Sequence, residues 1–292
     1  MGGGVMAGIF GAGVVTSLEE ENAYPFIEAV YGSSAGVMIA AYFLASQSKL
    51  GSSIFYEDLL NNFITPSYVP LGIYDRCKHR FITPLPHGTI RNPIDINYVS
   101  DIITGLKRID MKELERKNIP LYAHVLNTKK LKSEFIDVAN HEDPFRILKA
   151  AISAAPYYFS SDLQYIDGEI KNCFPITEIL EKYPNQRVIA IMNIMPNKTV
   201  RRFLKAILEG AVASLMYSAK IWKIYLRKDF LSRKEMRTAQ QNSRVTIICP
   251  PRELKLWPNT MNKDKLMRAY EAGREEGKKL AKIIKNDTLN RK

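Results

Sequence analysis

Val30-Tyr31-Gly32-Ser33-Ser34-Ala35-Gly36 is the stretch that decides the fold of this 292-residue chain. It contains the pattern Gly-x-Ser-x-Gly, with Ser34 at its centre. A nucleophilic serine needs a sharp turn between a strand and a helix, and the flanking glycines make that strained turn sterically possible. Ser34 is therefore the candidate nucleophile. The same residues also fit an ordinary Gly-Ser turn in which Ser33 or Ser34 caps a helix.

The residues on either side of this turn favour the catalytic interpretation. Residues 26–31 predict a buried strand, and residues 35–46 predict an apolar helix without proline. Strand-like runs alternate further along with helical stretches at 144–153 and 176–182, and these runs cover residues 119–126, 134–138, 187–195 and 244–249. This alternation predicts an α/β protein in which helices cover both faces of a central, mostly parallel sheet.

The composition predicts a single domain over residues 1–292. With 46% hydrophobic residues, the chain can bury one substantial core. No apolar run is long enough to span a bilayer, and the N-terminus lacks the pattern of a secretion signal, so a cytoplasmic location is expected. The three cysteines are widely separated and form no CxxC pair. This spacing indicates neither a disulfide framework nor a zinc site, and no metal or cofactor is expected.

The net charge of +12 is concentrated in the last third of the chain. Residues 201–292 contain 23 Lys/Arg and 9 Asp/Glu, whereas residues 1–200 have a net charge of −2. Two long basic helices are predicted in this part, at 201–227 and 263–285. Such a region attracts nucleic acid, anionic lipid or an acidic partner alike, and a basic helix with aromatic residues can lie on a membrane surface. We favour helices that pack one face on the sheet and solvate the other, and we expect no nucleic-acid partner.

The chain begins with a glycine loop, Gly2-Gly3-Gly4, that runs into a helix ending near residues 19–21. Gly2, Gly4 and Ala7 also fit a dinucleotide-binding pattern, but that pattern requires a preceding strand. No strand precedes the loop in this sequence. A glycine loop at a helix N-terminus presents N–H groups to an oxyanion without side-chain obstruction. Gly2, Gly3 and Gly4 are therefore the candidate oxyanion donors, with a flexible tail as the alternative.

A serine nucleophile also needs a base, and Asp167 is the candidate. It lies in an Asp-Gly pair at the end of a short apolar run, where its carboxylate can point across a sheet edge towards Ser34. Such a carboxylate could accept the serine proton directly if burial raised its pKa. Asp-Gly is also a common turn dipeptide. The alternative base is a histidine, and the chain has four, none in a recognisable catalytic loop: His79, His87, His124 and His141.

Residues 52–116 are predicted to be irregular, because five prolines interrupt short apolar runs that contain scattered aromatic residues. A segment of this kind suits a lid or the wall of an apolar pocket, and it also suits plain irregular packing.

Together, the glycine loop, the Ser34 motif and the late Asp-Gly pair resemble the patatin-like phospholipases, and in particular a bacterial branch of that family. The resemblance extends over GIFGAGVV, AAISAAPYYFSSDLQYIDGEI and the YEAG stretch at residues 270–273. It implies a three-layer α/β sandwich and a serine lipid acyl hydrolase of the phospholipase A or lysophospholipase kind. Ser34 and Asp167 would form a Ser-Asp dyad, and Gly32, Gly36 and Gly168 would be motif glycines.

The resemblance further implies a lipid or fatty acyl ester as substrate and allows peripheral contact with a membrane. The sequence departs from the family pattern at several positions. Family members have a strand before the glycine loop, so we expect a missing first strand or an incomplete N-terminus. Val5, Ala7 and Glu169 replace a loop glycine, a basic residue and a small residue, respectively. The alternative function is therefore a catalytically weakened relative that binds lipid or a membrane surface.

Overall fold

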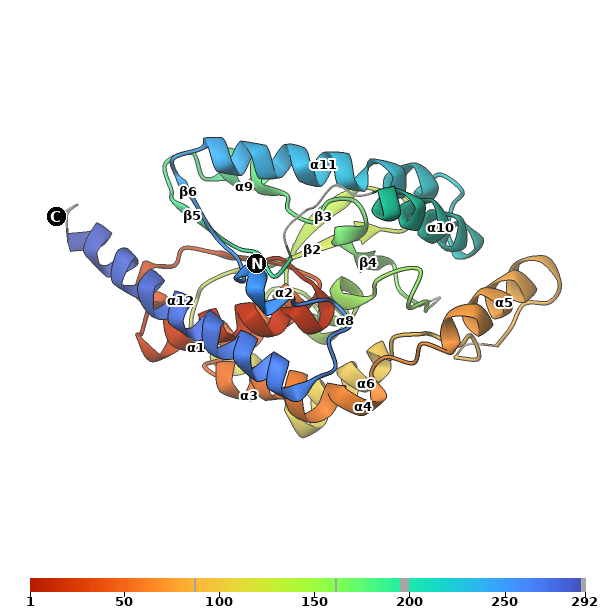
Figure 1. Cartoon of the computed structure of the whole chain (residues 1–292), viewed down its shortest axis with the longest axis horizontal. Helices are drawn as coiled ribbons and strands as arrows, with labels where there is room; N and C mark the ends of the chain where they lie inside the picture. The colour runs from red at the N-terminus through yellow and green to blue at the C-terminus, as the bar shows by residue number, and fades with distance from the viewer. Residues whose placement is uncertain (87, 161, 195–199, 290–292) are drawn as a thin grey trace.

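Two sheets lie at the centre of the computed structural model, which describes residues 1–86, 88–160, 162–194 and 200–289. The first sheet has four strands, β1 (Val30–Ser33), β2 (Leu121–Asn127), β3 (Ser133–Asp137) and β4 (Tyr165–Asp167). The second has two, β5 (Val188–Ile191) and β6 (Val245–Ile248). Helices lie on both sides of these strands (Figure 1). On one side are α9 (Ile176–Lys182) and α11 (Ile221–Gln241), and on the other are α1 (Ile9–Glu20), α2 (Ala35–Leu44) and α12 (Lys263–Leu289). The expected α/β class is confirmed.

The first sheet is mixed rather than mostly parallel. β1 runs parallel to β2, and β5 runs parallel to β6. β3 and β4 both run antiparallel to β2. β2 and β3 are joined by only five residues, 128–132, which is long enough for a hairpin but too short for the crossover that a parallel pair requires.

The helices that follow the two N-terminal motifs form the centre of the core. α1 (Ile9–Glu20) is buried from Ile9 to Leu18, and α2 (Ala35–Leu44) is buried from Gly36 to Leu44. A helix that is apolar on all sides must be covered on all sides. α2 is covered by β1, β2 and the neighbouring helices, including α1, α3 (Ser48–Ser53) and α8 (Pro144–Ile152).

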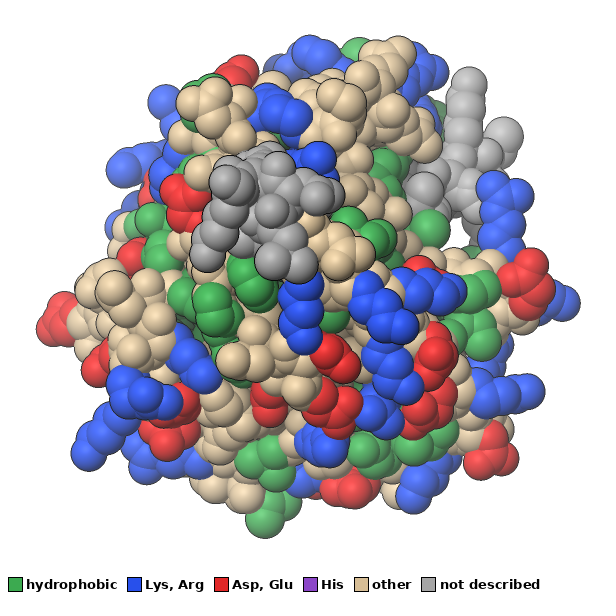
Figure 2. Space-filling model, turned by 90° about the vertical axis from the view of Figure 1, so that its left-hand side faces the viewer, with side chains coloured by type: hydrophobic (Ala, Val, Ile, Leu, Met, Phe, Trp, Pro, Cys, Tyr) green, Lys and Arg blue, Asp and Glu red, His purple; other side chains and the backbone are tan. Residues whose placement is uncertain are grey.

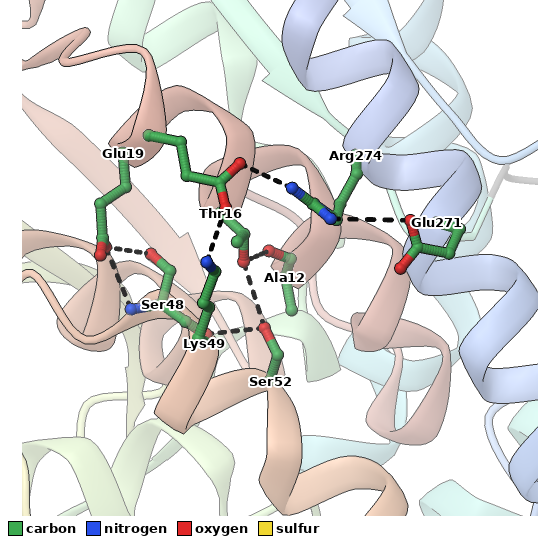
Figure 3. Close-up of polar contacts among 9 residues, drawn as sticks. Ala12, Thr16, Glu19, Ser48, Lys49, Ser52, Glu271 and Arg274 are labelled. Carbon is green, nitrogen blue, oxygen red and sulfur yellow. Dashed lines mark hydrogen bonds and ion pairs between the residues drawn. The ribbon is translucent and has the colours of Figure 1, made fainter.

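The last helix, α12 (Lys263–Leu289), packs closely against α1, although the two are far apart in sequence. A Cβ atom at Gly13 would lie 2.1 Å from the carbonyl oxygen of Tyr270, and one at Gly273 would lie 2.1 Å from that of Phe10. Glycine at both positions therefore lets the two backbones touch. Polar contacts also join α1 to its neighbours (Figure 3), among them Glu19 to Ser48 at the start of α3.

Residues 52–116, predicted to be irregular, are mostly helical. Pro70 does not prevent this, because it lies in the first turn of α5, where backbone N–H groups have no helical partner. The elements of this segment after α3 are η3 (Ile54–Asp58), α4 (Leu59–Asn62), α5 (Tyr68–Phe81), α6 (Ile96–Asp101), η4 (Ile102–Leu106) and α7 (Met111–Arg116).

Two further predictions differ from the structure. The strand expected at 26–31 covers only Val30–Ser33, after a helical turn, η2 (Tyr24–Phe26). The helix expected at 201–227 is two helices, α10 (Val200–Met216) and α11 (Ile221–Gln241). A turn at residues 217–220 separates them, and the chain then packs α11 back against α10.

The remaining elements are η1 (Val5–Gly8), η5 (Gly168–Ile170), α9 (Ile176–Lys182) and η6 (Arg252–Leu254). Among the helices described, none is both long and apolar enough to cross a membrane.

The first two residues lie between the two sheets. The Ser33 N–H donates to the Met1 carbonyl oxygen at 3.0 Å, and the Gly2 N–H donates to the Ile191 carbonyl oxygen at 2.8 Å. Met1 therefore contacts β1 while Gly2 contacts β5. A cavity of about 250 Å³ lies beside them, between residues of β1 and β5.

Candidate active site

The strand order brings Ser34 and Asp167 together. β1 and β4 pair with the same edge of β2, since β3 occupies the other edge. β1 runs parallel to β2 and ends at Ser33 opposite His124, whereas β4 runs antiparallel and ends at Asp167 opposite Val125. The carboxyl ends of the two strands therefore meet at consecutive residues of β2. Ser34 and Asp167, more than a hundred residues apart in sequence, therefore lie beside neighbouring residues of β2.

Ser34 occupies the strained turn that a nucleophile at this position requires. Its backbone angles are φ 51° and ψ −133°, a region that residues other than glycine rarely adopt. The glycines on either side are needed for steric reasons. A Cβ at Gly32 would lie 2.4 Å from the Cα of Val37, and one at Gly36 would lie 2.5 Å from the carbonyl oxygen of Met1. The Ser34 residue is only 6% exposed.

The Asp167 carboxyl group is set up to exchange a proton near neutral pH. Asp167 is 2% exposed, and its Oδ1 accepts the backbone N–H of Glu169 at 2.9 Å. Burial, followed by the negative charge of Glu169, raises the pKa of Asp167 to about 7. Three interactions lower this pKa: the hydrogen bond from the Glu169 N–H, a hydrogen bond with the Ser34 side chain, and the positive charge of Lys228. A carboxyl group with such a pKa can both accept and return a proton in a reaction cycle.

The glycine loop lies directly against Ser34. A Cβ at Gly3 would lie 2.4 Å from the Cβ of Ser34, so only glycine allows this approach. Gly4 has φ 129°, in the region that favours glycine. Two of the three predicted donors already have acceptors, because the Gly2 N–H bonds to Ile191 and the Gly3 N–H bonds to Glu169. Among the residues that the structure describes, the Gly4 N–H has no acceptor.

Glu169 is part of the site, although the sequence marked it only as a departure from a family pattern. Its Oε1 accepts the Gly3 N–H at 2.6 Å. Burial raises the pKa of Glu169, while the charge of Lys228 and the Gly3 N–H lower it. Lys228 comes from α11, and nothing in its sequence context distinguished it from the other basic residues of that helix. The site thus contains two neighbouring carboxyl groups, and the positive charges of Lys228 and of the N-terminal amino group of Met1 both favour the ionised form of Glu169.

His124 is buried beside the site but does not contact Ser34. Its Nδ1 lies 3.1 Å from the Ser33 hydroxyl oxygen, and its Nε2 has no partner among the described residues. Burial lowers the pKa of His124 to about 3, so the ring is neutral. The ring also packs on the Asp-Gly turn, since a Cβ at Gly168 would lie 2.6 Å from its Cγ. His124 therefore contacts both Ser33, the residue before Ser34, and Gly168, the residue after Asp167.

The other histidines contribute nothing to this site in the described part of the chain. His79 contacts Leu85 and His141 contacts Asp143, while His87 lies outside the described residues. The same part of the chain contains no cluster of three His, Cys, Asp or Glu side chains that could hold a metal ion.

An almost wholly apolar pocket opens beside Ser34. Its lining comes from η1, α2, α3, η3, α4 and α6 and from the end of α8 and the residues after it. Its lining includes Ser34, Met38, Phe55 and Ile152. The larger cavity between β1 and β5 is not lined by Ser34. The pocket that adjoins the candidate nucleophile is therefore suited to a hydrocarbon chain rather than to a polar group.

One of two comparisons with known proteins found a match. A search of curated proteins found no match. The family model described as patatin-like phospholipase matches residues 1–180, which include the glycine loop, Ser34 and Asp167. Because the match covers more than half of the 292 residues, the chain belongs to the patatin-like phospholipase family.

Proposed function

We propose that this member of a lipid hydrolase family cleaves acyl esters of lipids through an acyl-enzyme on Ser34, as a phospholipase A or lysophospholipase does. The observation that carries the proposal is the meeting of β1 and β4 on β2, which brings Ser34 to Asp167. The apolar pocket beside Ser34 supports an acyl chain as the group that is bound.

In the proposed reaction, Asp167 accepts the proton of Ser34 as the hydroxyl oxygen attacks the ester carbonyl carbon. The tetrahedral intermediate places its negative oxygen near the glycine loop, where the Gly4 N–H has no acceptor among the described residues and can donate. Asp167 then returns the proton to the departing alcohol, and an acyl-enzyme remains. Asp167 then takes a proton from a water molecule, whose oxygen attacks the acyl carbonyl carbon, and Asp167 returns that proton to the Ser34 oxygen as the fatty acid leaves.

One observation favours a second candidate function, a relative of reduced activity that binds lipid without efficient turnover. The Gly3 N–H, a candidate oxyanion donor, is bonded to Glu169. Losing one oxyanion donor costs roughly 3 kcal/mol of transition-state stabilisation in other serine hydrolases. Binding of an acyl chain in the apolar pocket would not depend on that donor.

Labelling with a fluorophosphonate probe separates the two functions. An active enzyme should form one adduct at Ser34, hydrolyse a short-chain nitrophenyl ester, and lose both properties on Ser34→Ala substitution. Asp167→Asn should abolish turnover and slow labelling while leaving the fold intact, as checked by circular dichroism. A protein that takes no label and shows no turnover would exclude the proposed hydrolysis and leave the second function, and turnover that persists in Ser34→Ala would exclude Ser34 as nucleophile.

A further inference from the structure

Helix α11 has two different faces, and the inner one contacts the segment that carries the candidate site. The Tyr225 hydroxyl donates to the carbonyl oxygen of Ala155, and the Ser232 hydroxyl oxygen accepts the backbone N–H of Cys173 at 3.1 Å. Lys228 acts on the pKa of both site carboxyl groups. α11 runs along the outside of the molecule (Figure 1), so its opposite face is free of the core.

The outer face of α11 combines large apolar side chains with positive charge. Trp222, Leu226 and Phe230 follow one another at four-residue spacing and are 44%, 40% and 63% exposed. All the charged residues among the exposed positions of α11 are basic. The exposed residues are Trp222, Lys223, Leu226, Arg227, Phe230, Lys234, Arg237, Gln240 and Gln241. Asp229 and Glu235, the acidic residues of this helix, are only half-exposed.

Helix α10, which packs against α11, has a similar surface. Phe203, Leu204 and Leu208 are 55%, 55% and 68% exposed. Lys205 is also exposed. The α10–α11 hairpin therefore leaves six large apolar side chains at least 40% exposed.

Helix α12 shows what an ordinary basic helix of this chain looks like. Its exposed residues include Asp264, Glu271 and Glu275 among the lysines and arginines, and Ile283 is its exposed large apolar residue among those described. Acidic and basic side chains three residues apart form ion pairs along it, such as Lys278 with Glu275 at 2.8 Å. Figure 2, which views the end of the molecule where α12 finishes, shows both charges intermixed. The basic composition of the last third alone does not produce the surface of α11.

From this contrast we infer that the outer face of the α10–α11 hairpin docks on an anionic phospholipid membrane. Aromatic and aliphatic side chains insert at the boundary between head groups and acyl chains, and the adjacent Lys and Arg side chains bind the anionic head groups. The inference rests on the proposed function for its purpose, because a lipid hydrolase needs contact with a lipid surface. Residues 200–241 lie outside the residues matched by the family model.

The binding experiment uses the full chain with Ser34→Ala, so that docking is measured without turnover. Trp222 and Trp257 are the two tryptophans of the chain, and Trp257→Phe therefore leaves Trp222 as a single fluorescent probe. Vesicles of equal parts phosphatidylcholine and phosphatidylglycerol should shift its emission to the blue, and brominated acyl chains should quench it. Vesicles of phosphatidylcholine alone should bind at least about tenfold more weakly, since the attraction of several basic residues is lost.

Two variants and a matched control test which residues bind. In the Ser34→Ala chain, Trp222→Ser/Leu226→Ser/Phe230→Ser should abolish sedimentation with the anionic vesicles, and Lys223→Glu/Arg227→Glu should lose the preference for anionic lipid. The same triple substitution in the chain that keeps Ser34 should leave turnover of a soluble ester unchanged. The control, Leu106→Ser/Trp257→Ser/Ile283→Ser, replaces equally exposed apolar residues at other places and should bind normally.

The docking surface is wrong if the full chain ignores anionic vesicles, or if the control loses binding as much as the α11 variant. A dimer in sedimentation equilibrium that the α11 variant disrupts would assign the face to a second copy of the chain instead. Because binding is measured with Ser34→Ala, a failure of the proposed hydrolysis leaves these results unaffected.

Discussion

The Gly3 N–H donates a 2.6 Å hydrogen bond to Glu169 Oε1, so a carboxyl group of the protein itself occupies a candidate oxyanion donor. The same Glu169 raises the pKa of Asp167 through its negative charge. The Glu169 side chain thus affects both the pKa of the candidate base, Asp167, and the availability of a candidate oxyanion donor, the Gly3 N–H. The two influences are separable, because glutamine removes the charge but keeps an acceptor, whereas alanine removes both.

Replacing Glu169 with Gln should shift the acidic limb of the kcat/KM profile to lower pH, by on the order of one unit. Asp167 must be ionised to accept the proton of Ser34, and a neighbouring negative charge favours its protonated form. Removing that charge lowers the pKa of Asp167. The variant therefore keeps Asp167 ionised at a pH at which Asp167 of the parent protein is already protonated. The profile is measured with a soluble nitrophenyl ester.

Glu169→Ala should show the same shift and also raise the plateau of kcat/KM above that of Glu169→Gln. Alanine leaves the Gly3 N–H free to bind the oxyanion, and such donors are worth roughly 3 kcal/mol elsewhere. Equal plateaus in the two variants would mean that the Gly3 N–H takes no part in the reaction.

Replacing Asp167 with Asn should abolish turnover but stabilise the fold at alkaline pH. The pKa of this buried carboxyl group is raised above its ordinary value, so the folded state holds a proton that the unfolded state releases. The free energy of unfolding of the parent protein therefore falls as the pH rises from about 4 to about 7, by about 1.4 kcal/mol for each unit of the shift. Asparagine removes this dependence.

Thermal unfolding at several pH values measures this effect. The gain in Tm of Asp167→Asn over the parent protein should be larger at about pH 8 than at about pH 5. The exposed Asp101→Asn is the control and should show no such increase. A gain that is constant with pH would contradict a raised pKa for Asp167.

The sequence predicted those parts of the site that depend on local backbone geometry. Gly-x-Ser-x-Gly specifies the turn at Ser34 because each glycine is sterically required, and Asp-Gly specifies the turn at Asp167 because the His124 ring leaves no space for a Cβ at Gly168. Short patterns of neighbouring residues mark both turns, although the atoms that crowd Gly36 and Gly168 belong to Met1 and His124, which are distant in sequence. The helices at 144–152 and 176–182 were also predicted to within one residue of their ends.

The parts that sequence reasoning missed depend on contacts between distant segments. Glu169 and Lys228 gain their roles from Gly3 and from the packing of α11, and no pattern within either segment signals this. The helices of residues 52–116 were missed because prolines were treated as breaks without regard to their position. Pro70 lies in the first turn of α5, where proline is tolerated.

Gly168→Ala should lower both stability and activity. The new Cβ would lie 2.6 Å from the His124 ring, which is buried and bonded to Ser33. Overpacking of this kind destabilises a protein by about 1–3 kcal/mol. Denaturant unfolding measures the loss, and Gly105→Ala is the control, since a Cβ there meets no atom within 4 Å. If both glycines tolerated alanine equally, the contact between His124 and the Asp-Gly turn would not be a tight one.

Ser34→Gly should unfold at a higher denaturant concentration than Ser34→Ala, although neither variant has a nucleophile. The backbone at Ser34 has φ 51° and ψ −133°. This conformation lowers the free energy of unfolding by on the order of 1–3 kcal/mol for a residue with a Cβ, and by much less for glycine. The neighbouring pair Ser33→Gly and Ser33→Ala is the matched control. Ser33 lies in strand β1, where glycine is the less stable choice by roughly 0.5–1 kcal/mol. The order of the two substitutions should therefore reverse between adjacent residues, and the same order at both positions would show that the turn at Ser34 is not strained.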